Sequence, residues 1–199
     1  MFDWLLSETH AISILKKDHE TVKELFDQFE KAETRPAKRK VAAQALNELK
    51  VHATLEEEIF YPAVRKHVGG DLMNEADEEH HVAKLLIAEL SSMKETDDHH
   101  DAKFTVLAEN VRHHIKEEEN EVMPKAKGAN IDFERLGQEM LERKKELLAN
   151  GVPPAAEELL IASNPKADSP AKAAKRKPPR AAHHGTGSVR KRTRTAAKK

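Results

Sequence analysis

The sequence has 199 residues, of which 38% are apolar and 35% are Asp, Glu, Lys or Arg, which is enough for one bundle-sized domain and a tail. The longest uncharged apolar runs, residues 11–15 and 85–88, are far shorter than the roughly 20 residues of a membrane-spanning helix, so we expect no membrane contact. The lack of cysteine excludes disulfides, thiolate metal sites and cysteine nucleophiles. The first residues show no export signal, and we expect a cytoplasmic protein.

Few glycines and aromatic residues, with much Ala, Leu, Glu and Lys, favour helices over sheets. Apolar residues recur at helical spacing along four segments that stop signals separate. The predicted helices span about 9–32, Pro36 to about 66, a cap at Asp71 to about 94, and the residues after 96–98 to about 127. Short turns between long helices predict an all-α fold, an antiparallel up-down-up-down four-helix bundle.

Charge divides the rest of the chain from this bundle. A fifth amphipathic helix is predicted over about 132–149, without an indication of where it packs. Residues 1–164 contain 22 Lys or Arg and 34 Asp or Glu, whereas residues 165–199 contain 12 and 1. We expect this tail to be disordered, because it buries too little apolar surface to offset the entropy of ordering. The predicted organisation is a bundle (1–128), an additional helix and linker (129–163), and a disordered Lys/Arg/Pro/Ala-rich tail (164–199).

An internal repeat of 61 to 62 residues relates the first two predicted helices to the next two. The stretch 52–62 recurs as 114–124, with His, Glu, Glu and Pro at a constant offset of 62. His19 and His80 begin matching apolar patterns in the first and third helices. Each helix therefore contributes one histidine at an equivalent level of the bundle.

At 100° per residue, all four histidines fall on the apolar stripes of their helices. Glu56 and Glu118 each follow a histidine by four residues and share its buried face. An ionised carboxylate in a core is costly unless a cation neutralises it, and imidazole with carboxylate suits iron, manganese or zinc. The predicted metal ligands are His19, His52, Glu56, His80, His114 and Glu118.

These motifs resemble the hemerythrin-like, or HHE cation-binding, family over roughly residues 10–127. The matching residues are 15–20, His52-x-x-x-Glu56-Glu57 with 60–62, Glu79-His80-His81, and His114-x-x-x-Glu118-Glu119 with 123–124. The resemblance implies a four-helix bundle around two non-heme iron ions with an oxo or hydroxo bridge. Glu56 and Glu118 would bridge the ions, while His19 and His52 would serve one iron and His80 and His114 the other.

One departure from the family concerns Lys84, which stands where oxygen-carrying members have a fifth histidine. This argues against reversible oxygen carriage. Lys84 and the repeat-related Lys23 either extend along the bundle edge, or Lys84 donates a hydrogen bond to bound oxygen or peroxide. Glu117 and Glu121 are expected on the inward side, either as further ligands or as partly solvated neighbours.

Other histidines leave alternatives open. His81 and His113 adjoin predicted ligands and would replace them if the register slipped by one residue. The remaining six are expected to be exposed, with the tail pair as a candidate weak metal site: His10, His67, His99, His100, His183 and His184.

Two functions follow from such a centre. A di-iron protein can bind oxygen or reduce peroxide, with catalase-like or peroxidase-like turnover. The alternative is a non-catalytic iron or oxygen sensor or binding module whose folding or partner contacts depend on metal or oxygen. The basic tail favours non-specific DNA or RNA contact, although a solubilising tail or one that folds back on the acidic bundle has the same charge. The sequence indicates no organic substrate and no oligomeric state.

Overall fold

The computed structural model describes residues 6–94 and 96–163, and every regular element in those ranges is helical. The all-α class predicted from the sequence is therefore confirmed. The predicted disorder of the tail from residue 164, and the pair His183 and His184, lie outside the described residues. Within these residues, no helix combines the length and apolar composition that a membrane span requires.

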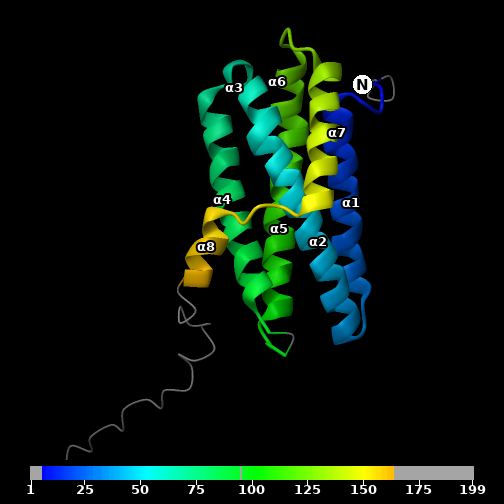
Figure 1. Ribbon diagram of the computed structural model, residues 1–199, viewed down its shortest axis with the longest axis vertical. Coiled ribbons are helices and arrows are strands. Elements are labelled where there is room, and N and C mark those ends of the chain that lie inside the picture. The colour runs from blue at the N-terminus through cyan, green and yellow to red at the C-terminus, as the bar shows by residue number, and fades with distance from the viewer. Residues whose placement is uncertain (1–5, 95, 164–199) are drawn as a thin grey trace, which may run out of the picture. The chain divides into compact units, whose positions relative to one another are not determined.

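The long helical segments are labelled in Figure 1, in chain order. They are α1 (Ala11–Lys31), α2 (Arg35–Leu55) with η2 (Glu56–Phe60) and α3 (Tyr61–Val68), α4 (Gly70–Ser92), and α5 (His100–Glu117) with η3 (Glu118–Val122) and α6 (Met123–Lys127). The chain then forms α7 (Phe133–Asn150) and α8 (Ala156–Ser163). The two η segments are single π-helical turns that continue the helices before them.

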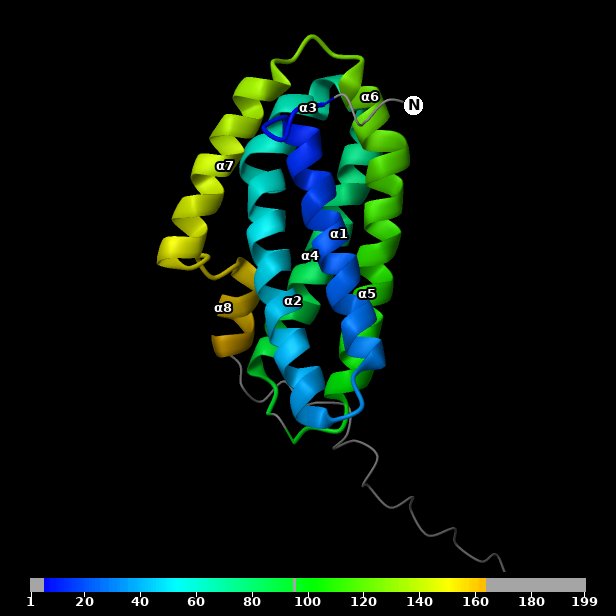
Figure 2. The ribbon, with the colours of Figure 1, turned by 90° about the vertical axis from the view of Figure 1, so that its right-hand side faces the viewer.

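The long helices enclose a common core. Helix α1 packs against α2 and α5, and α4 packs against the same two helices, so the four close a ring. Figures 1 and 2 show them side by side. Two separate apolar clusters fill the interior: on α1, Leu15 belongs to one and Val22 to the other. The level between these clusters is occupied by polar side chains.

Local signals account for the helix ends. Thr34 caps α2, because its hydroxyl accepts a hydrogen bond from the N–H of Ala37, and Pro36 occupies the first turn. Gly69 joins α3 to α4 with a φ of 112°, a left-handed conformation that favours glycine. The prediction that Asp71 caps α4 is wrong: Gly69 takes the cap position, and Asp71 lies in the first turn, since this glycine reverses the chain without a longer loop.

The π turns shift the buried stripe by one residue. Tyr61 donates its N–H to the carbonyl of Glu56, five residues back, as in a π-helix. A proline without an N–H, Pro62 or Pro124, stands in the first turn of the α-helix that follows each π turn. In the fourth helical segment the buried residue is consequently Val122, and Glu121 is exposed. The expected inward position of Glu121 is therefore wrong, because regular 100° spacing does not continue through the extra residue of a π turn.

Helix α7 lies on the outside of α1 and α2 (Figure 2). Its Gly137 meets the start of α1 so closely that a Cβ there would lie 1.8 Å from the carbonyl oxygen of Thr9. Farther along α7, the ammonium group of Lys144 lies 2.5 Å from Asp18 of α1. The fifth predicted helix thus packs directly behind the polar level of the core.

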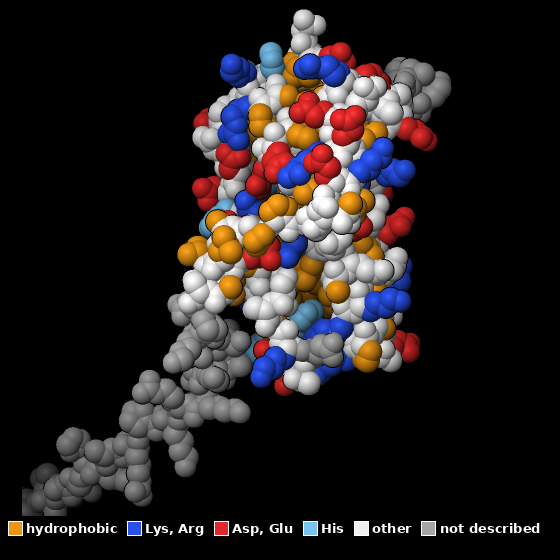
Figure 3. All heavy atoms as spheres, viewed as in Figure 1, with side chains coloured by type: hydrophobic (Ala, Val, Ile, Leu, Met, Phe, Trp, Pro, Cys, Tyr) orange, Lys and Arg blue, Asp and Glu red, His pale blue; other side chains and the backbone are white. Residues whose placement is uncertain are grey.

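The segment expected to be a linker contains a further helix, α8, which packs along α4. Glu157 pairs with Nδ1 of His81 at 2.7 Å, and Glu158 pairs with Lys50 at 2.7 Å. Hydrophobic side chains gather around α8 in the space-filling view (Figure 3). Leu159 and Leu160 of this helix are exposed. Ion pairs therefore contribute to the attachment of this short helix.

Candidate metal centre

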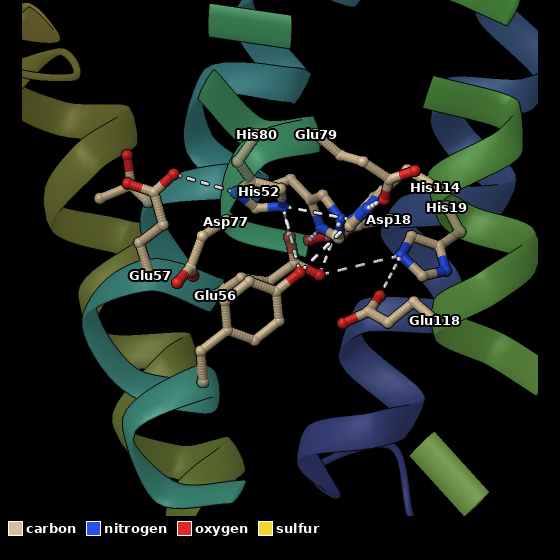
Figure 4. Close-up of polar contacts among 12 residues, drawn as sticks. Asp18, His19, His52, Glu56, Glu57, Asp77, Glu79, His80, His114 and Glu118 are labelled. Carbon is tan, nitrogen blue, oxygen red and sulfur yellow. Dashed lines mark hydrogen bonds and ion pairs between the residues drawn. The ribbon is translucent and has the colours of Figure 1, made fainter. Parts of the chain in front are cut away.

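All six predicted ligands lie in the polar level between the two apolar clusters. Each residue has a relative exposure of 6% or less. Figure 4 shows the labelled side chains of this layer pointing toward one another from different helices. The residues are His19 on α1, His52 at the end of α2, Glu56 in η2, His80 on α4, His114 on α5 and Glu118 in η3.

The donor atoms form two groups that share Glu56. His19, His52, Glu56 and Glu118 each offer an atom within 4.8 Å of the others, and Glu56, His80 and His114 form a second such group. One oxygen of Glu56 lies 3.1 Å from Nε2 of His52, and its other oxygen lies 3.3 Å from Nε2 of His80. Glu56 therefore stands between the two groups, as a bridging ligand would.

Glu118 lies closer to one group than to the other. One of its oxygens is 3.1 Å from Nε2 of His19. Among the sets whose donors lie within 4.8 Å, it belongs only to the set of His19 and His52. The structure thus brings Glu118 into the layer without placing it symmetrically between the histidine pairs.

Several inward-facing atoms of this layer lack a hydrogen bond, although some of them lie as close as 3.1 Å to one another. They include Nε2 of His19, Nε2 of His52, and both oxygens of Glu56 and of Glu118. A buried polar atom without a partner is destabilising, and the penalty is larger for a charged group. A cation bound among these atoms would satisfy them together. The donor set and its geometry therefore fit a metal.

The outward nitrogens of the histidines face a second set of carboxylates. Nδ1 of His19 lies 2.9 Å from Glu119, that of His80 lies 2.9 Å from Glu57, and that of His114 lies 2.7 Å from Glu79. Nδ1 of His52 has a longer separation from Asp18, 3.9 Å. A carboxylate on the far nitrogen orients an imidazole and increases its basicity as a metal ligand.

Comparison with known proteins identifies the family of this chain. The family model named Hemerythrin HHE cation binding domain matches residues 10–126. The chain belongs to this family. The solved structure of a hemerythrin HHE cation-binding domain-containing protein from Mycobacterium kansasii has a TM-score of 0.59 and 21% identity, covering 76% of this chain and 98% of its own. That likeness shows the fold, and no match was found among curated proteins. The family and the buried donors together indicate a cation-binding domain.

Three lysines surround the outer carboxylates of this hemerythrin domain. Lys84 lies 2.9 Å from Glu57, Lys23 lies 3.4 Å from Glu119, and Lys144 of α7 holds Asp18. The ammonium groups of Lys84 and Lys23 therefore bind outer carboxylates, and their side chains are a quarter to a third exposed at the bundle edge.

Electrostatics within the hemerythrin domain favour charged groups in the metal-free layer. Burial lowers the pKa of His52, but the charge of Glu56 and the nearby Asp18 outweigh burial and raise this pKa to about 10. Burial is likewise outweighed at His80, where Glu56 and Glu57 raise the pKa to about 9. Burial raises the pKa of Glu56, but the two imidazoles hold it well below its usual value. Imidazolium groups thus supply positive charge when no metal does.

Sequence reasoning did not assign a site role to Tyr61. This buried residue places its hydroxyl 3.1 Å from Nε2 of His80 and 3.4 Å from Nε2 of His114. Burial and the surrounding carboxylates raise the pKa of Tyr61 well above its usual value, so it is a neutral phenol. Its repeat partner is Met123. The sequence signal that could have indicated this role is the difference between the two repeat-related positions, because Tyr61 is polar and Met123 is not.

The alternative ligands lie outside the layer. His81 is 57% exposed and pairs with Glu157, and His113 is 59% exposed and lies 3.2 Å from Glu117. Glu117 itself is partly exposed, with its carboxylate near His113. The structure therefore keeps the register of His80 and His114.

Two of the remaining histidines differ from expectation. His67 and His99 are exposed, as predicted. His100, the first residue of α5, is buried, because Arg39 of α2 binds the adjacent Asp101 at 2.7 Å and holds the start of α5 in place.

His10 is half-buried, because its ring accepts a hydrogen bond from the N–H of Ile12 and stacks on Phe133 of α7. The prediction that His10 and His100 are exposed is wrong.

Proposed function

We propose that this hemerythrin-family protein binds two non-heme iron ions in its buried layer and binds oxygen or reduces peroxide there. The observation that carries the proposal is the division of the donors into two groups that share Glu56, whose oxygens face opposite histidines. One ion would be held by His19 and His52, and the other by His80 and His114. Glu118 would be the second bridging ligand. An antiparallel up-down-up-down bundle is part of this proposal, since it brings one histidine from each of the four long helices to the same level.

Iron bound in such a site would supply one-electron chemistry at oxygen or peroxide. The protein's own contribution is to orient the imidazoles through the outer carboxylates and to exclude water with apolar clusters on both sides of the layer. The neutral hydroxyl of Tyr61 is available to donate a hydrogen bond to a small ligand beside His80 and His114. We assign this role to Tyr61 rather than to Lys84, whose ammonium group binds Glu57.

Metal analysis and a visible absorption spectrum test the di-iron proposal. We expect two irons per chain with absorption bands of a bridged ferric pair, and we expect the double variant His52→Ala/His114→Ala to lose both. The matched control is His67→Ala/His81→Ala, which removes two exposed imidazoles and leaves the layer intact. Retention of the parent's metal content by the first variant would contradict the proposal.

A non-catalytic iron or oxygen sensor is the second candidate, supported by the direct link between the layer and the packing of four helices. Addition of hydrogen peroxide to the iron-loaded protein separates the two. Sustained oxygen release supports a catalase-like activity, and continued peroxide loss that requires an added reductant supports a peroxidase-like one. A stoichiometric spectral change without turnover supports the sensor.

We also propose that the tail contacts DNA or RNA without sequence selectivity. The support is its charge: residues 165–199 have 12 Lys or Arg and 1 acidic residue. Such chains bind phosphates with release of counterions, so binding weakens steeply with salt. A gel shift at two salt concentrations, comparing the full chain with one that ends at Asn164, tests this. Equal binding by both chains would contradict the proposed role of the tail.

A further inference from the structure

The four outer carboxylates do not have equivalent surroundings. A lysine lies beside each of Asp18, Glu57 and Glu119. Within the described residues no lysine or arginine is paired with Glu79, although it also binds a histidine of the layer. Its neighbours are His113 and Glu117 of α5, whose side chains are metal-ligand types. The corner of the site formed by Glu79, His113 and Glu117 therefore offers potential metal ligands, whereas lysines lie beside the other three outer carboxylates.

The geometry at this corner leaves one carboxylate oxygen of Glu79 available. Its Oε2 lies 2.7 Å from Nδ1 of His114, while its Oε1 lies 3.6 Å from Nε2 of His113. Glu117, one turn after His113, has an oxygen 3.2 Å from the same nitrogen. The three residues offer one donor atom each within 4.8 Å. This spacing allows a single cation to contact all three.

The corner connects the surface to the buried layer. The side chain of His113 is 59% exposed, that of Glu117 is 29% exposed, and that of Glu79 is 14% exposed. Behind Glu79 lies a cavity of about 30 Å³ that also borders His80 and His114. Glu79 therefore contacts both the surface cluster and the cavity beside the inner histidines.

The same cavity contains a polar group without a partner. Asn110, which lines it together with Glu79, has a buried side-chain oxygen that makes no hydrogen bond. A cavity of this size holds one water molecule or one ion. The amide oxygen is a further potential metal-ligating atom among the residues that line this cavity.

We propose that Glu79, His113 and Glu117 form a surface site for a divalent transition-metal ion, through which Fe²⁺ enters the buried layer. The inference that the ion passes inward rests on the proposed function, whereas the surface site itself does not. Mixed imidazole and carboxylate ligation suits Fe²⁺, and the ion takes the place that lysine has at the other corners. One oxygen of Glu79 contacts this site and its other oxygen contacts Nδ1 of His114. An ion at the site therefore lies beside Glu79, the residue that orients the inner ligand His114.

The surface site is tested with Mn²⁺ as the probe on the iron-loaded full-length protein. Electron paramagnetic resonance counts free Mn²⁺ during the titration, and we expect one additional site per chain. The variant His113→Ala should weaken that site at least about tenfold. The control, His81→Ala, removes an equally exposed histidine next to another layer residue and should leave Mn²⁺ binding unchanged. No additional Mn²⁺ site, or an unchanged site in His113→Ala, would overturn the proposal.

Entry is tested by the rate of Fe²⁺ uptake into the metal-free protein under anaerobic conditions. We expect His113→Ala and Glu117→Gln to slow uptake several-fold while the final iron content stays at the parent's value. The control Glu121→Gln changes an exposed carboxylate of η3 that pairs with Lys125 outside the cluster, and should not slow uptake. Equal rates in all variants would overturn the entry role. If the parent takes up no iron, the proposed function fails, while the Mn²⁺ titration of that metal-free chain still decides the surface site.

Discussion

Glu57 lies 2.9 Å from Nδ1 of His80, and it directly follows Glu56, which lies on the other side of the same imidazole. Two adjacent residues of η2 therefore contact both nitrogens of one histidine from α4. The π turn thus carries one carboxylate that is buried in the layer, Glu56, and one that is partly exposed at its edge, Glu57.

Glu57→Gln should weaken metal binding by about 10- to 100-fold, because the amide is a poorer acceptor for Nδ1 of His80 and no longer balances the charge of Lys84. Competition with a chelator of known affinity measures the change. Glu58→Gln is the control, since Glu58 is exposed and pairs with Arg143 instead. A loss of equal size in both variants would show that the effect is not specific to the histidine contact.

Tyr61→Phe should preserve iron content and alter reactivity. The substitution removes the hydroxyl near His80 and His114 while the ring still fills its buried position. We expect peroxide consumption, or the binding of azide as a small anionic probe, to fall while the metal content stays the same. The comparison variant Met123→Leu changes the repeat-related position without removing a polar group. Unchanged peroxide and azide behaviour in Tyr61→Phe would contradict the assigned hydrogen-bond role.

The metal-free protein should lose stability as the pH rises from about 6.5 to about 10. The raised values of about 10 for the pKa of His52 and about 9 for that of His80 mean that the folded state holds protons that the unfolded state releases near pH 6.5. This stabilisation is complete below about pH 6.5 and is lost as the pH rises through the folded-state values. Thermal unfolding followed by circular dichroism at a series of pH values measures it.

Metal loading should release protons for the same reason. At about pH 7 the imidazoles of His52 and His80 are protonated in the metal-free layer, and a bound ion must displace those protons. Binding should therefore tighten with rising pH, and a dye indicator in weak buffer should record proton release. The variant His52→Gln should release fewer protons. Loading without proton release in the parent would disprove the charged state assigned to the layer.

Gly137→Ala should destabilise the protein by about 3 kcal/mol or more, at the upper end of overpacking effects. The new methyl group would lie 1.8 Å from the carbonyl oxygen of Thr9, which is backbone and cannot move alone. Denaturant unfolding measures the free-energy change. Gly70→Ala is the control, because a Cβ at Gly70 meets nothing within 4 Å. Equal stability of the two variants would mean that α7 does not pack this closely on the start of α1.

Residues that share one helix could be related by sequence alone. The spacing of His52 to Glu56 and of His114 to Glu118 depends on local helix geometry, which is nearly constant. The 62-residue repeat then relates one helical segment to another by sequence alone. Periodicity and the repeat together therefore predicted six inward-facing residues, and they distinguished His80 and His114 from their exposed neighbours His81 and His113. Where local geometry changed, at the π turns, the same arithmetic misplaced Glu121.

Contacts between helices were decided only by the tertiary structure. The pairing of Glu79 with His114, the approach of Tyr61 to two imidazoles and the position of α7 behind Asp18 join residues far apart in the chain. Their geometry depends on how helices are rotated and spaced against each other, which follows from the packing of all side chains at once. Periodicity shows which face of a helix is buried. It does not show which residue of another helix that face will meet.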